Sequence, residues 1–407
     1  MKNRLLAEFA SAEEFKEATE RRTAAYSSVR EDSSTGATNK LPAEVELCKK
    51  SNIIVAGGGT AGHLFPAIAL GEELMQRGYE LHLITDVRCQ KYLTEDLKLI
   101  PHIINFRLAP KGLINRFKLL ISLLFVTFKM LLLLVKIKPY AIIGFGGYPT
   151  FPPLLAAVFL RIPIIVYEQN CFIGKANRFF LKYARKVALT YDETKNYNIL
   201  DKNKKLVIGN IVRENVKNLK VRENFNNDTF RIFIFGGSQG AKVLSTLIPE
   251  AIQILVQSNP DIKLHITQQA SLEDHDNIAK IYAQLKIPYK LADFFYDMEQ
   301  QYASQELVIS RAGASTISEL CYVGLPAIFI PLPSASENHQ FYNAKALEDS
   351  GAGWCFEQST ITAEKLADKI LVLVKNRDIL KKTSIELLKR KHDGSKVLAD
   401  AVEEIIS

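Results

Sequence analysis

A glycine-rich segment between an apolar run and a helical pattern is the strongest constraint on how this chain of 407 residues can fold. Residues 56–63 read Ala-Gly-Gly-Gly-Thr-Ala-Gly-His and follow the apolar run 53–55, which is typical of a buried strand. The next residues, through Leu74, carry apolar side chains at helical spacing. Glycines at a strand-to-helix turn leave backbone N–H groups open to a phosphate or sugar at the positive end of the helix dipole. His63 adds a titratable imidazole to the same turn.

Strand-like runs and helical patterns alternate along the chain in two series. The runs are expected at 53–55, 81–85, 103–106, 141–144, 164–167, 187–189 and 206–208, and then at 230–235, 263–267, 289–291, 307–310 and 327–331. Such alternation implies right-handed crossovers and mostly parallel sheets. Each series has a glycine-rich loop after its first strand. The predicted fold class is therefore α/β, with two doubly wound, Rossmann-like domains that face each other across a cleft.

The two series suggest domain boundaries. The expected parts are an N-terminal extension at 1–50, a first domain at 51–214, a linker at 215–229, a second domain at 230–390 and a C-terminal helix at 391–407. The extension is polar and is expected to be disordered. Its residues 20–38 resemble peptides encoded by mobile palindromic repeats in some bacterial genes. Whether the C-terminal helix crosses back to the first domain stays open on the sequence alone.

Charge and cysteine content narrow the compartment and the partners. The formal net charge of +8 suits an acidic partner, which could be a phosphate compound, an anionic membrane surface or nucleic acid. The five cysteines are scattered and contain no CxxC pair, so neither a zinc site nor a disulfide framework is expected. The charged N-terminus lacks the apolar core of a signal peptide, and we expect a cytosolic chain with reduced thiols.

One segment, 119–135, is apolar almost throughout and is flanked by basic residues. Three structures fit it: a crossover helix buried against the sheet, a helix lying in a membrane interface, or a transmembrane span. The segment is slightly short of the ~20 residues that span a bilayer, and Lys129 interrupts it, so a span is the weakest of the three. The flanking lysines suit lipid phosphates.

The first loop also matches the dinucleotide fingerprint. Gly57, Gly59 and Gly62 have the GxGxxG spacing, and Asp86 ends the second strand, where a ribose-binding acid belongs. A dehydrogenase must therefore be considered. However, the loop is longer than the fingerprint requires, and the second series has its own Gly-Gly-Ser-Gln-Gly loop at 236–240, which one dinucleotide does not need.

Three other strand ends carry polar motifs. Ser238 in the loop 236–240 could cap the following helix, contact a diphosphate, or do both. Thr316 and Glu319 have capping-box spacing, but the Glu319 carboxylate could equally accept the two hydroxyls of a ribose. The cluster 337–344, rich in amides, is either a solvated helix start or, if it faces a cleft, a set of contacts for sugar hydroxyls.

Taken together, these motifs resemble one family, the bacterial peptidoglycan glycosyltransferases that add N-acetylglucosamine (GlcNAc) to lipid I and form lipid II. The resemblance covers about residue 52 to the C-terminus, and its seven motifs, in chain order, lie at 58–63, 146–148, 168–170, 209–213, 236–241, 311–319 and 339–344. It implies a GT-B fold, an inverting reaction and UDP-GlcNAc bound by the second domain. It further implies lipid I bound by the first domain and a peripheral position on the cytoplasmic face of the inner membrane, with its anionic surface as a partner. No cofactor, no metal and no nucleic acid are expected.

The family's functional residues transfer to this chain motif by motif. The resemblance implies His63 as the candidate catalytic base. It implies substrate contacts from ten residues: Thr60, Ala61, Gly62 and Asn170 near the sugars, Arg213 and Ser238 on the diphosphate, Phe295 at the uracil, Glu319 at the ribose, and Gln340 and Asn343 at the GlcNAc hydroxyls. The chain departs from the family at Ala61, at Tyr167 and at 149–152, where the residues after the second motif are bulkier.

Two alternatives of other kinds remain beside this interpretation. A sugar-nucleotide epimerase of the same fold would need an acid/base set for elimination and no lipid acceptor. A membrane-docked subunit that binds a sugar nucleotide without chemistry of its own would not need His63.

Overall fold

Strands that are apolar on both faces dictate two layered α/β halves. The structure, a computed structural model, describes residues 51–94, 97–106, 112–192, 194–195, 202–219, 225, 228–237 and 242–407, so the expected extension at 1–50 lies outside it. In β1 (Asn52–Ala56), Ile53 and Val55 pack on one face of the sheet and Ile54 and Ala56 on the other. Burial on both faces is what a parallel sheet between two helical layers requires.

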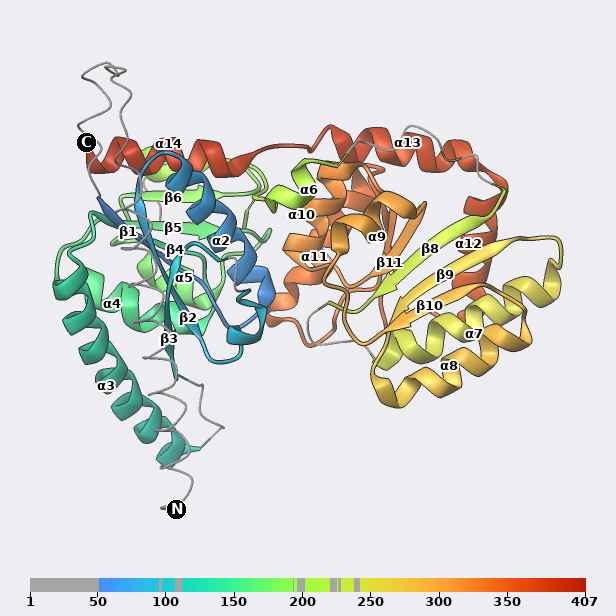
Figure 1. The fold of residues 1–407 in the computed structure, drawn as a ribbon, viewed down its shortest axis with the longest axis horizontal. Helices are drawn as coiled ribbons and strands as arrows, with labels where there is room; N and C mark the ends of the chain where they lie inside the picture. The colour runs from blue at the N-terminus through green and yellow to red at the C-terminus, as the bar shows by residue number, and fades with distance from the viewer. Residues whose placement is uncertain are drawn as a thin grey trace, which may run out of the picture. The chain divides into compact units, whose positions relative to one another are not determined.

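The first half contains a seven-stranded parallel sheet (Figure 1). Its strands, in spatial order, are β3 (Ile100–Ile104), β2 (Glu80–Asp86), β1, β4 (Ala141–Gly144), β5 (Ile164–Glu168), β6 (Lys186–Leu189) and β7 (Lys205–Val207). Its helices are α2 (Ala61–Gln76), α3 (Leu113–Ile137), α4 (Phe151–Phe159), α5 (Lys175–Phe180) and the short turns η2 (Gln90–Tyr92), η3 (Tyr148–Thr150) and η4 (Lys202–Lys204). Helix α2 covers one face, and α3, α4 and α5 cover the other.

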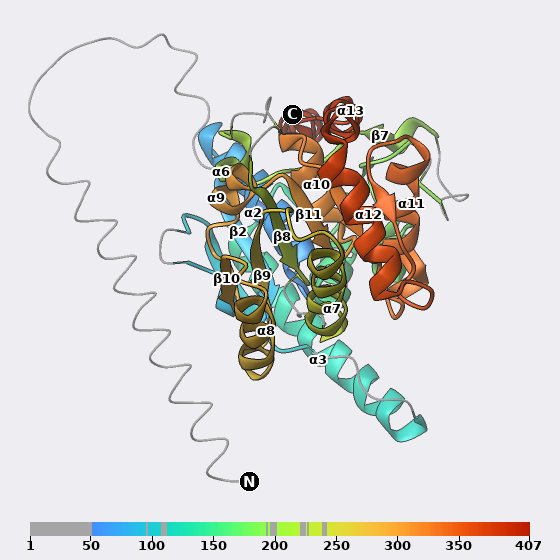
Figure 2. The same cartoon turned by 90° about the vertical axis from the view of Figure 1, so that its right-hand side faces the viewer.

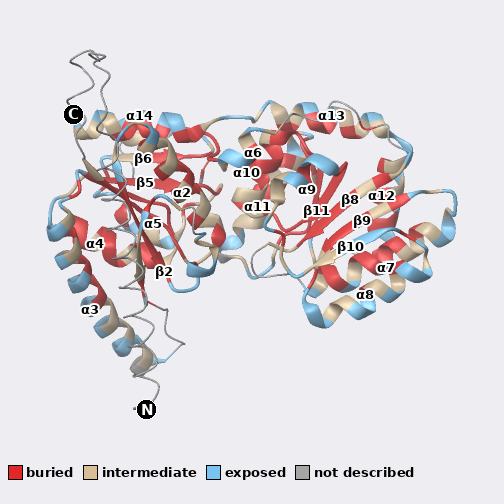
Figure 3. Cartoon of the chain, viewed as in Figure 1, coloured by how far each residue is buried: buried red, intermediate tan, exposed pale blue. Residues whose placement is uncertain are grey.

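The second half repeats this plan with a six-stranded parallel sheet. Its strands, in spatial order, are β10 (Tyr289–Ala292), β9 (Leu264–Gln269), β8 (Phe230–Phe235), β11 (Leu307–Ser310), β12 (Ala327–Phe329) and β13 (Trp354–Cys355). Its helices are α6 (Glu214–Lys217), α7 (Lys242–Ser258), α8 (Leu272–Gln284), α9 (Met298–Ser304), α10 (Ala314–Val323), η5 (Ser336–Asn338), α11 (His339–Asp349), α12 (Ala363–Lys375) and α13 (Arg377–Leu388). Figures 2 and 3 show helices on both sides of each sheet and the buried strands between them.

The prediction of two doubly wound parallel sheets is confirmed, with differences at strand ends. Strand β3 begins at Ile100, three residues before the predicted start at 103. Pro101 is tolerated there because β3 lies at the edge of the sheet, where a missing N–H leaves no partner unpaired. Strand β13 was not predicted because it has only two residues. Of the predicted linker, residues 220–224 and 226–227 lie outside the described residues, while α6 occupies 214–217.

The last helix, α14 (Gly394–Ile406), packs against α2 and β4 of the first half (Figure 1). Leu398, Ala399 and Val402 are buried there in the same cluster as β1. Arg77, which follows α2, donates to Asp400 (2.6 Å) and Glu403 (2.8 Å) on α14. The chain therefore passes between the halves twice, after β7 and again before α14, where Gly394 N donates to Asn210 O (2.8 Å).

We predict that Leu398→Ala lowers the free energy of unfolding by about 2–5 kcal/mol, because it opens a cavity where the buried side chain met the first sheet. Val397→Ala is the matched control. The Val397 side chain, next to Leu398 in the sequence, is 40% exposed, so its truncation should lower the free energy of unfolding much less. Urea denaturation followed by circular dichroism measures both. Equal losses from the two variants would contradict the packing of α14 on the first half.

Candidate active site

A cavity of about 1690 Å³ lies where strand ends of both sheets meet. The loops after β1, β4 and β5 line it from the first half, and those after β8, β11 and β12 line it from the second. Doubly wound sheets bind ligands at the carboxyl ends of their strands, on either side of the point where the strand order reverses. The order of both sheets reverses here, between β1 and β4 and between β8 and β11.

Asp86 gives the first glycine-rich loop its shape. Its carboxylate accepts hydrogen bonds from Gly59 N (2.9 Å), Arg88 Nε (2.9 Å) and the Tyr148 hydroxyl (3.0 Å). Although burial opposes ionisation, these hydrogen bonds lower the pKa of Asp86. Gly59 has a φ of +84°, which glycine adopts readily. Because the Asp86 oxygens already bind groups of the protein, Asp86 does not fit the role of the ribose-binding acid that a dehydrogenase would need.

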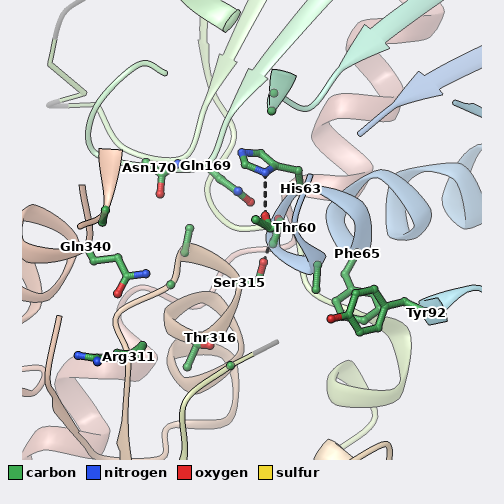
Figure 4. A pocket seen from close by; sticks show the side chains of 18 of the residues that line it. Thr60, His63, Phe65, Tyr92, Gln169, Asn170, Arg311, Ser315, Thr316 and Gln340 are labelled. Carbon is green, nitrogen blue, oxygen red and sulfur yellow. Dashed lines mark hydrogen bonds between the residues drawn. The ribbon is translucent and has the colours of Figure 1, made fainter. Parts of the chain in front are cut away.

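His63 lies in the first turn of α2 and lines the cavity (Figure 4). Its Nδ1 is 2.9 Å from Thr60 Oγ1. The loop after β4 approaches it closely, since a Cβ on Gly147 would lie 3.5 Å from His63 Nδ1 and 2.3 Å from the carbonyl oxygen of Gly58. Burial, and then the nearby charge of His339, lower the pKa of His63 to about 4, so the imidazole is neutral at pH 7.

Glu168 organises the loop after β5. Its Oε1 accepts from Asn170 N (3.1 Å) and Asn170 Nδ2 (2.9 Å), and its Oε2 accepts from Gly174 N (2.9 Å) and Asn177 Nδ2 (3.0 Å). Four N–H donors occupy the acceptor positions of a carboxylate, so Glu168 holds the loop in place. Asn170 Oδ1 in turn accepts from Asn343 Nδ2 (3.2 Å), and Asn343 Oδ1 accepts from Cys171 N (3.1 Å). Asn343 thus connects α11 to the first half.

Arg213, between the two sheets, and Glu319 of α10 form a charged pair beside the cavity. Arg213 Nε lies 2.6 Å from Glu319 Oε1, and Arg213 Nη2 lies 3.0 Å from Glu319 Oε2. The Tyr302 hydroxyl donates to the same Oε2 (2.9 Å), and the Arg213 guanidinium lies over the Phe65 ring, 4.7 Å from its centroid. The capping-box interpretation of Glu319 is wrong, because α10 begins after Gly313 and Glu319 lies in its middle.

The other predicted site residues lie at different places around the cavity. Thr60, Ala61, Gly62, Asn170, Arg213, Phe295, Glu319 and Gln340 line it. The ring of Phe295 packs edge-on against Phe233. Gln340 Oε1 accepts from Leu332 N (3.0 Å), which fixes the orientation of its amide. Asn343 is buried at the contact described above, and Ser238 lies outside the described residues.

Four residues around the cavity received no role from the sequence. Phe65 stacks on Arg213, Tyr302 orients Glu319, and Ser315 Oγ donates to Gly62 O (3.1 Å), which joins α10 to the first loop (Figure 4). Arg311 Nη1 donates to Ile330 O (2.9 Å) and Pro331 O (3.1 Å) and so fixes the loop after β12. Of these four, only Arg311 and Ser315 lie inside one of the seven motifs, and no local sequence pattern marked Phe65 or Tyr302.

Among the described residues, no group of three or more His, Cys, Asp or Glu side chains is arranged to hold a metal ion.

Comparison with known proteins decides the family. The profile of the glycosyltransferase family 28 N-terminal domain matches residues 53–189, and that of the family's C-terminal domain matches 231–398. The chain belongs to glycosyltransferase family 28. The recognition made from the seven motifs is confirmed by relatives within this family.

Two of these relatives are named UDP-N-acetylglucosamine–N-acetylmuramyl-(pentapeptide) pyrophosphoryl-undecaprenol N-acetylglucosamine transferase. The protein from Rickettsia bellii (strain RML369-C) is 53% identical over 357 residues, which is 87% of this chain and 99% of that protein. The protein from Rickettsia canadensis (strain McKiel) is 55% identical over 355 residues, again 87% of this chain and 99% of that protein.

Solved structures agree with the family 28 assignment. The crystal structure of Acinetobacter baumannii MurG matches with a TM-score of 0.69 at 28% identity, over 87% of this chain and 99% of that chain. The predicted GT-B architecture is therefore confirmed. A putative UDP-N-acetylglucosamine 2-epimerase from Listeria monocytogenes matches with a TM-score of 0.63 at 13% identity, over 87% of this chain and 96% of that chain, which shows a shared fold alone.

We predict that His63 does not titrate between pH 5.5 and 8, because its pKa lies at about 4. Two-dimensional NMR of 13C-histidine-labelled protein measures this, and the resonance is assigned by its loss in His63→Gln. The unfolded chain takes up a proton near pH 6.5, whereas the folded chain takes it up only near pH 4, so this histidine lowers stability as the pH falls through that window. A midpoint near 6.5 in the folded protein would contradict the prediction.

Proposed function

We propose that this chain transfers GlcNAc from UDP-GlcNAc to the C4 hydroxyl of the N-acetylmuramyl sugar of lipid I, with inversion at the anomeric carbon, and so forms lipid II. The observation that carries the proposal is the 53–55% identity to transferases named for these substrates, of which the chain covers 99%. The arrangement of the motif residues supports it, because most of them line a single cavity formed by both halves.

The acceptor side of this proposal centres on His63. As base, His63 removes the proton from the attacking hydroxyl while C1 of GlcNAc separates from UDP. When the imidazole proton is on Nδ1, this N–H donates a hydrogen bond to Thr60 Oγ1. The other ring nitrogen, Nε2, then has a free lone pair that can accept a proton. A neutral imidazole has this lone pair at pH 7, which fits a general base. Glu168 is unsuited to the role, because four N–H groups occupy its oxygens.

The donor side depends on the pair of Arg213 and Glu319. We infer that Glu319 accepts hydrogen bonds from the ribose hydroxyls and that Arg213 and Ser238 hold the diphosphate, with Arg213 supplying the positive charge. Arg213 Nε and Nη2 both contact Glu319, so in this proposal the donor shares or replaces these contacts. Gln340 is oriented to donate its amide N–H groups to the GlcNAc hydroxyls, because its oxygen faces Leu332 N. Positive charge held near the departing oxygens stabilises the transition state.

Transfer of radiolabelled GlcNAc from UDP-GlcNAc to a lipid I analogue, with EDTA present, tests the reaction. Label in a disaccharide-lipid product is the expected result. Release of UDP with an altered sugar and no lipid product would favour the epimerase alternative. Tight binding of UDP-GlcNAc without any reaction would favour a noncatalytic subunit.

We expect His63→Ala to lower kcat by about 10²- to 10⁴-fold in the same assay, as loss of a general base does. The KM for UDP-GlcNAc should change little, because His63 does not hold the donor in this proposal. Thr60→Val should also lower kcat, since it removes the hydroxyl that selects the His63 tautomer. Thr60→Ser keeps the hydroxyl and should therefore keep kcat near the wild-type value. Near-normal turnover by His63→Ala would rule out His63 as the base.

Helix α3 carries the proposed contact with the membrane. It includes one segment, Asn115–Ile137, that is long and apolar enough to cross a bilayer, and 22% of its most apolar window is buried. Its outer face exposes a set of large apolar side chains: Phe117, Leu120, Ile121, Leu124, Phe125, Phe128, Leu132 and Val135. If α3 crossed the bilayer, the sheet on which it packs would lie at membrane depth, because Val126, Met130 and Leu134 are buried in the same cluster as strands of that sheet.

We therefore propose that α3 lies in the interface of the cytoplasmic leaflet of the inner membrane and does not cross it. Its outer apolar face would enter the acyl boundary, as in interfacial helices. Lys118, Lys136 and Lys138 are exposed beside that face and would meet anionic headgroups. Lys129 lies over the Phe125 ring, at 4.5 Å from its centroid, so its charge does not prevent burial of the neighbouring apolar surface.

Phe128→Ser should weaken binding to vesicles that contain anionic lipid by about tenfold or more, because the buried area of one aromatic side chain is lost. Ile385→Ser is the control, since Ile385 is similarly exposed, at 56% against 58% for Phe128, but lies on α13 of the second half. Sedimentation with sucrose-loaded vesicles measures both variants. An equal loss in both, or none in Phe128→Ser, would contradict binding through α3.

A further inference from the structure

The amino-terminal half of α3 stands away from the other described elements of the first half, and the described residues leave part of its inner side uncovered. Along that inner side, Val126, Met130 and Leu134 are buried against the core, whereas Leu119 and Leu123 are only partly buried. Figures 1 and 2 show this end of α3 projecting from the body of the protein, and Figure 3 shows its burial decreasing toward that end. Leu119 and Leu123 line the cavity of the active site.

Aromatic side chains line the cavity near these two leucines. Phe106, Tyr148 and Phe151 also line it, and the rings of Phe106 and Tyr148 are 5.9 Å apart between centroids. All three belong to the cluster of apolar side chains into which Leu119 and Leu123 pack. We call the part of the cavity lined by these five residues the prenyl branch. None of the five side chains carries a charge.

The prenyl branch is continuous with the catalytic end of the cavity. Tyr148 directly follows Gly147, whose backbone lies against the His63 imidazole. The Tyr148 hydroxyl donates to Asp86 (3.0 Å), so that its polar atom is held by the first loop while its ring belongs to the apolar lining. At its other end the branch reaches α3, whose outer face is exposed and apolar. One path therefore joins the proposed base to the proposed membrane surface.

We propose that the prenyl branch holds the first isoprene units of the acceptor, next to its diphosphate. This inference rests on the proposed function, since it requires a polyprenyl-linked acceptor. The leucine and aromatic side chains that line the branch are uncharged and suit a hydrocarbon chain. The relatives are named for an acceptor whose sugar is joined to undecaprenol through a pyrophosphoryl group, so the acceptor would bring such a chain to the cavity. A chain in this branch leaves the bilayer beside α3 without its methyl groups entering water.

The test compares two soluble acceptors that share the muramyl-pentapeptide diphosphate, one capped by a methyl group and one by two isoprene units. In the wild-type protein, without detergent or vesicles, the KM for the prenyl acceptor should be about tenfold lower or more, as expected for burying several methylene-sized groups. Leu123→Asn should remove this advantage, so that the KM for the prenyl acceptor rises to that for the methyl acceptor. Leu123→Trp, which fills the branch without adding a charge, should do the same.

Leu133→Asn is the matched control, because Leu133 is also partly buried on α3 and packs into the same cluster but does not line the cavity. It should keep the prenyl advantage, so loss in Leu133→Asn as well would point to disturbed packing of α3 and overturn the proposal. The proposal would also be overturned if both Leu123 variants kept the lower KM for the prenyl acceptor. The same holds if this difference disappeared only in Leu124→Asn, which changes the exposed outer face of α3. If the wild-type protein transfers GlcNAc to neither acceptor, the proposed function itself fails, which is a separate result.

Discussion

The bidentate contact between Arg213 and Glu319 is the interaction on which the geometry of the cleft depends most. Arg213 lies just after the first sheet and stacks on Phe65 of α2, while Glu319 belongs to α10 of the second half. Both charges are largely removed from water, so removing one partner would leave a buried, uncompensated charge, which typically costs about 3–5 kcal/mol. Such a pair specifies orientation more than stability, because two parallel N–H···O bonds form only when the guanidinium and the carboxylate are coplanar. This contact therefore fixes α10 relative to α2.

A second connection between the halves consists of amides. Glu168 fixes Asn170, Asn170 accepts from Asn343, and Asn343 bonds back to Cys171 N. The hydrogen bonds from Asn343 to Asn170 and from Cys171 N to Asn343 join neutral groups, so separating them costs less than separating the Arg213 pair. One charged contact and one neutral contact therefore join the two halves beside the cavity.

The sequence predicted the architecture well because its signals were local. Apolar runs followed by glycines at 57–59 and 236–237 mark strand-to-helix turns, and repeated alternation leaves few topologies other than two parallel sheets. The prediction was less successful where contacts between distant residues decide the role. Glu319 had capping-box spacing, yet its partners are Arg213 and Tyr302, 106 and 17 residues away. Phe65 and Asp86 likewise acquire their roles from Arg213 and Tyr148, which only the folded chain brings near them.

Helix α3 illustrates how a single segment can satisfy several of the structures that its sequence allowed. The sequence left a buried crossover helix and an interfacial helix open, and the carboxyl-terminal part of α3 is buried on its inner side while its outer face is exposed. An apolar helix that is half buried and half exposed is stable next to lipid, where the exposed side needs no polar cover. The same division creates the prenyl branch, because a helix packed along its whole length would close the space beside Leu119 and Leu123. Incomplete packing at one end of α3 therefore places its exposed apolar face next to the cavity where His63 lies.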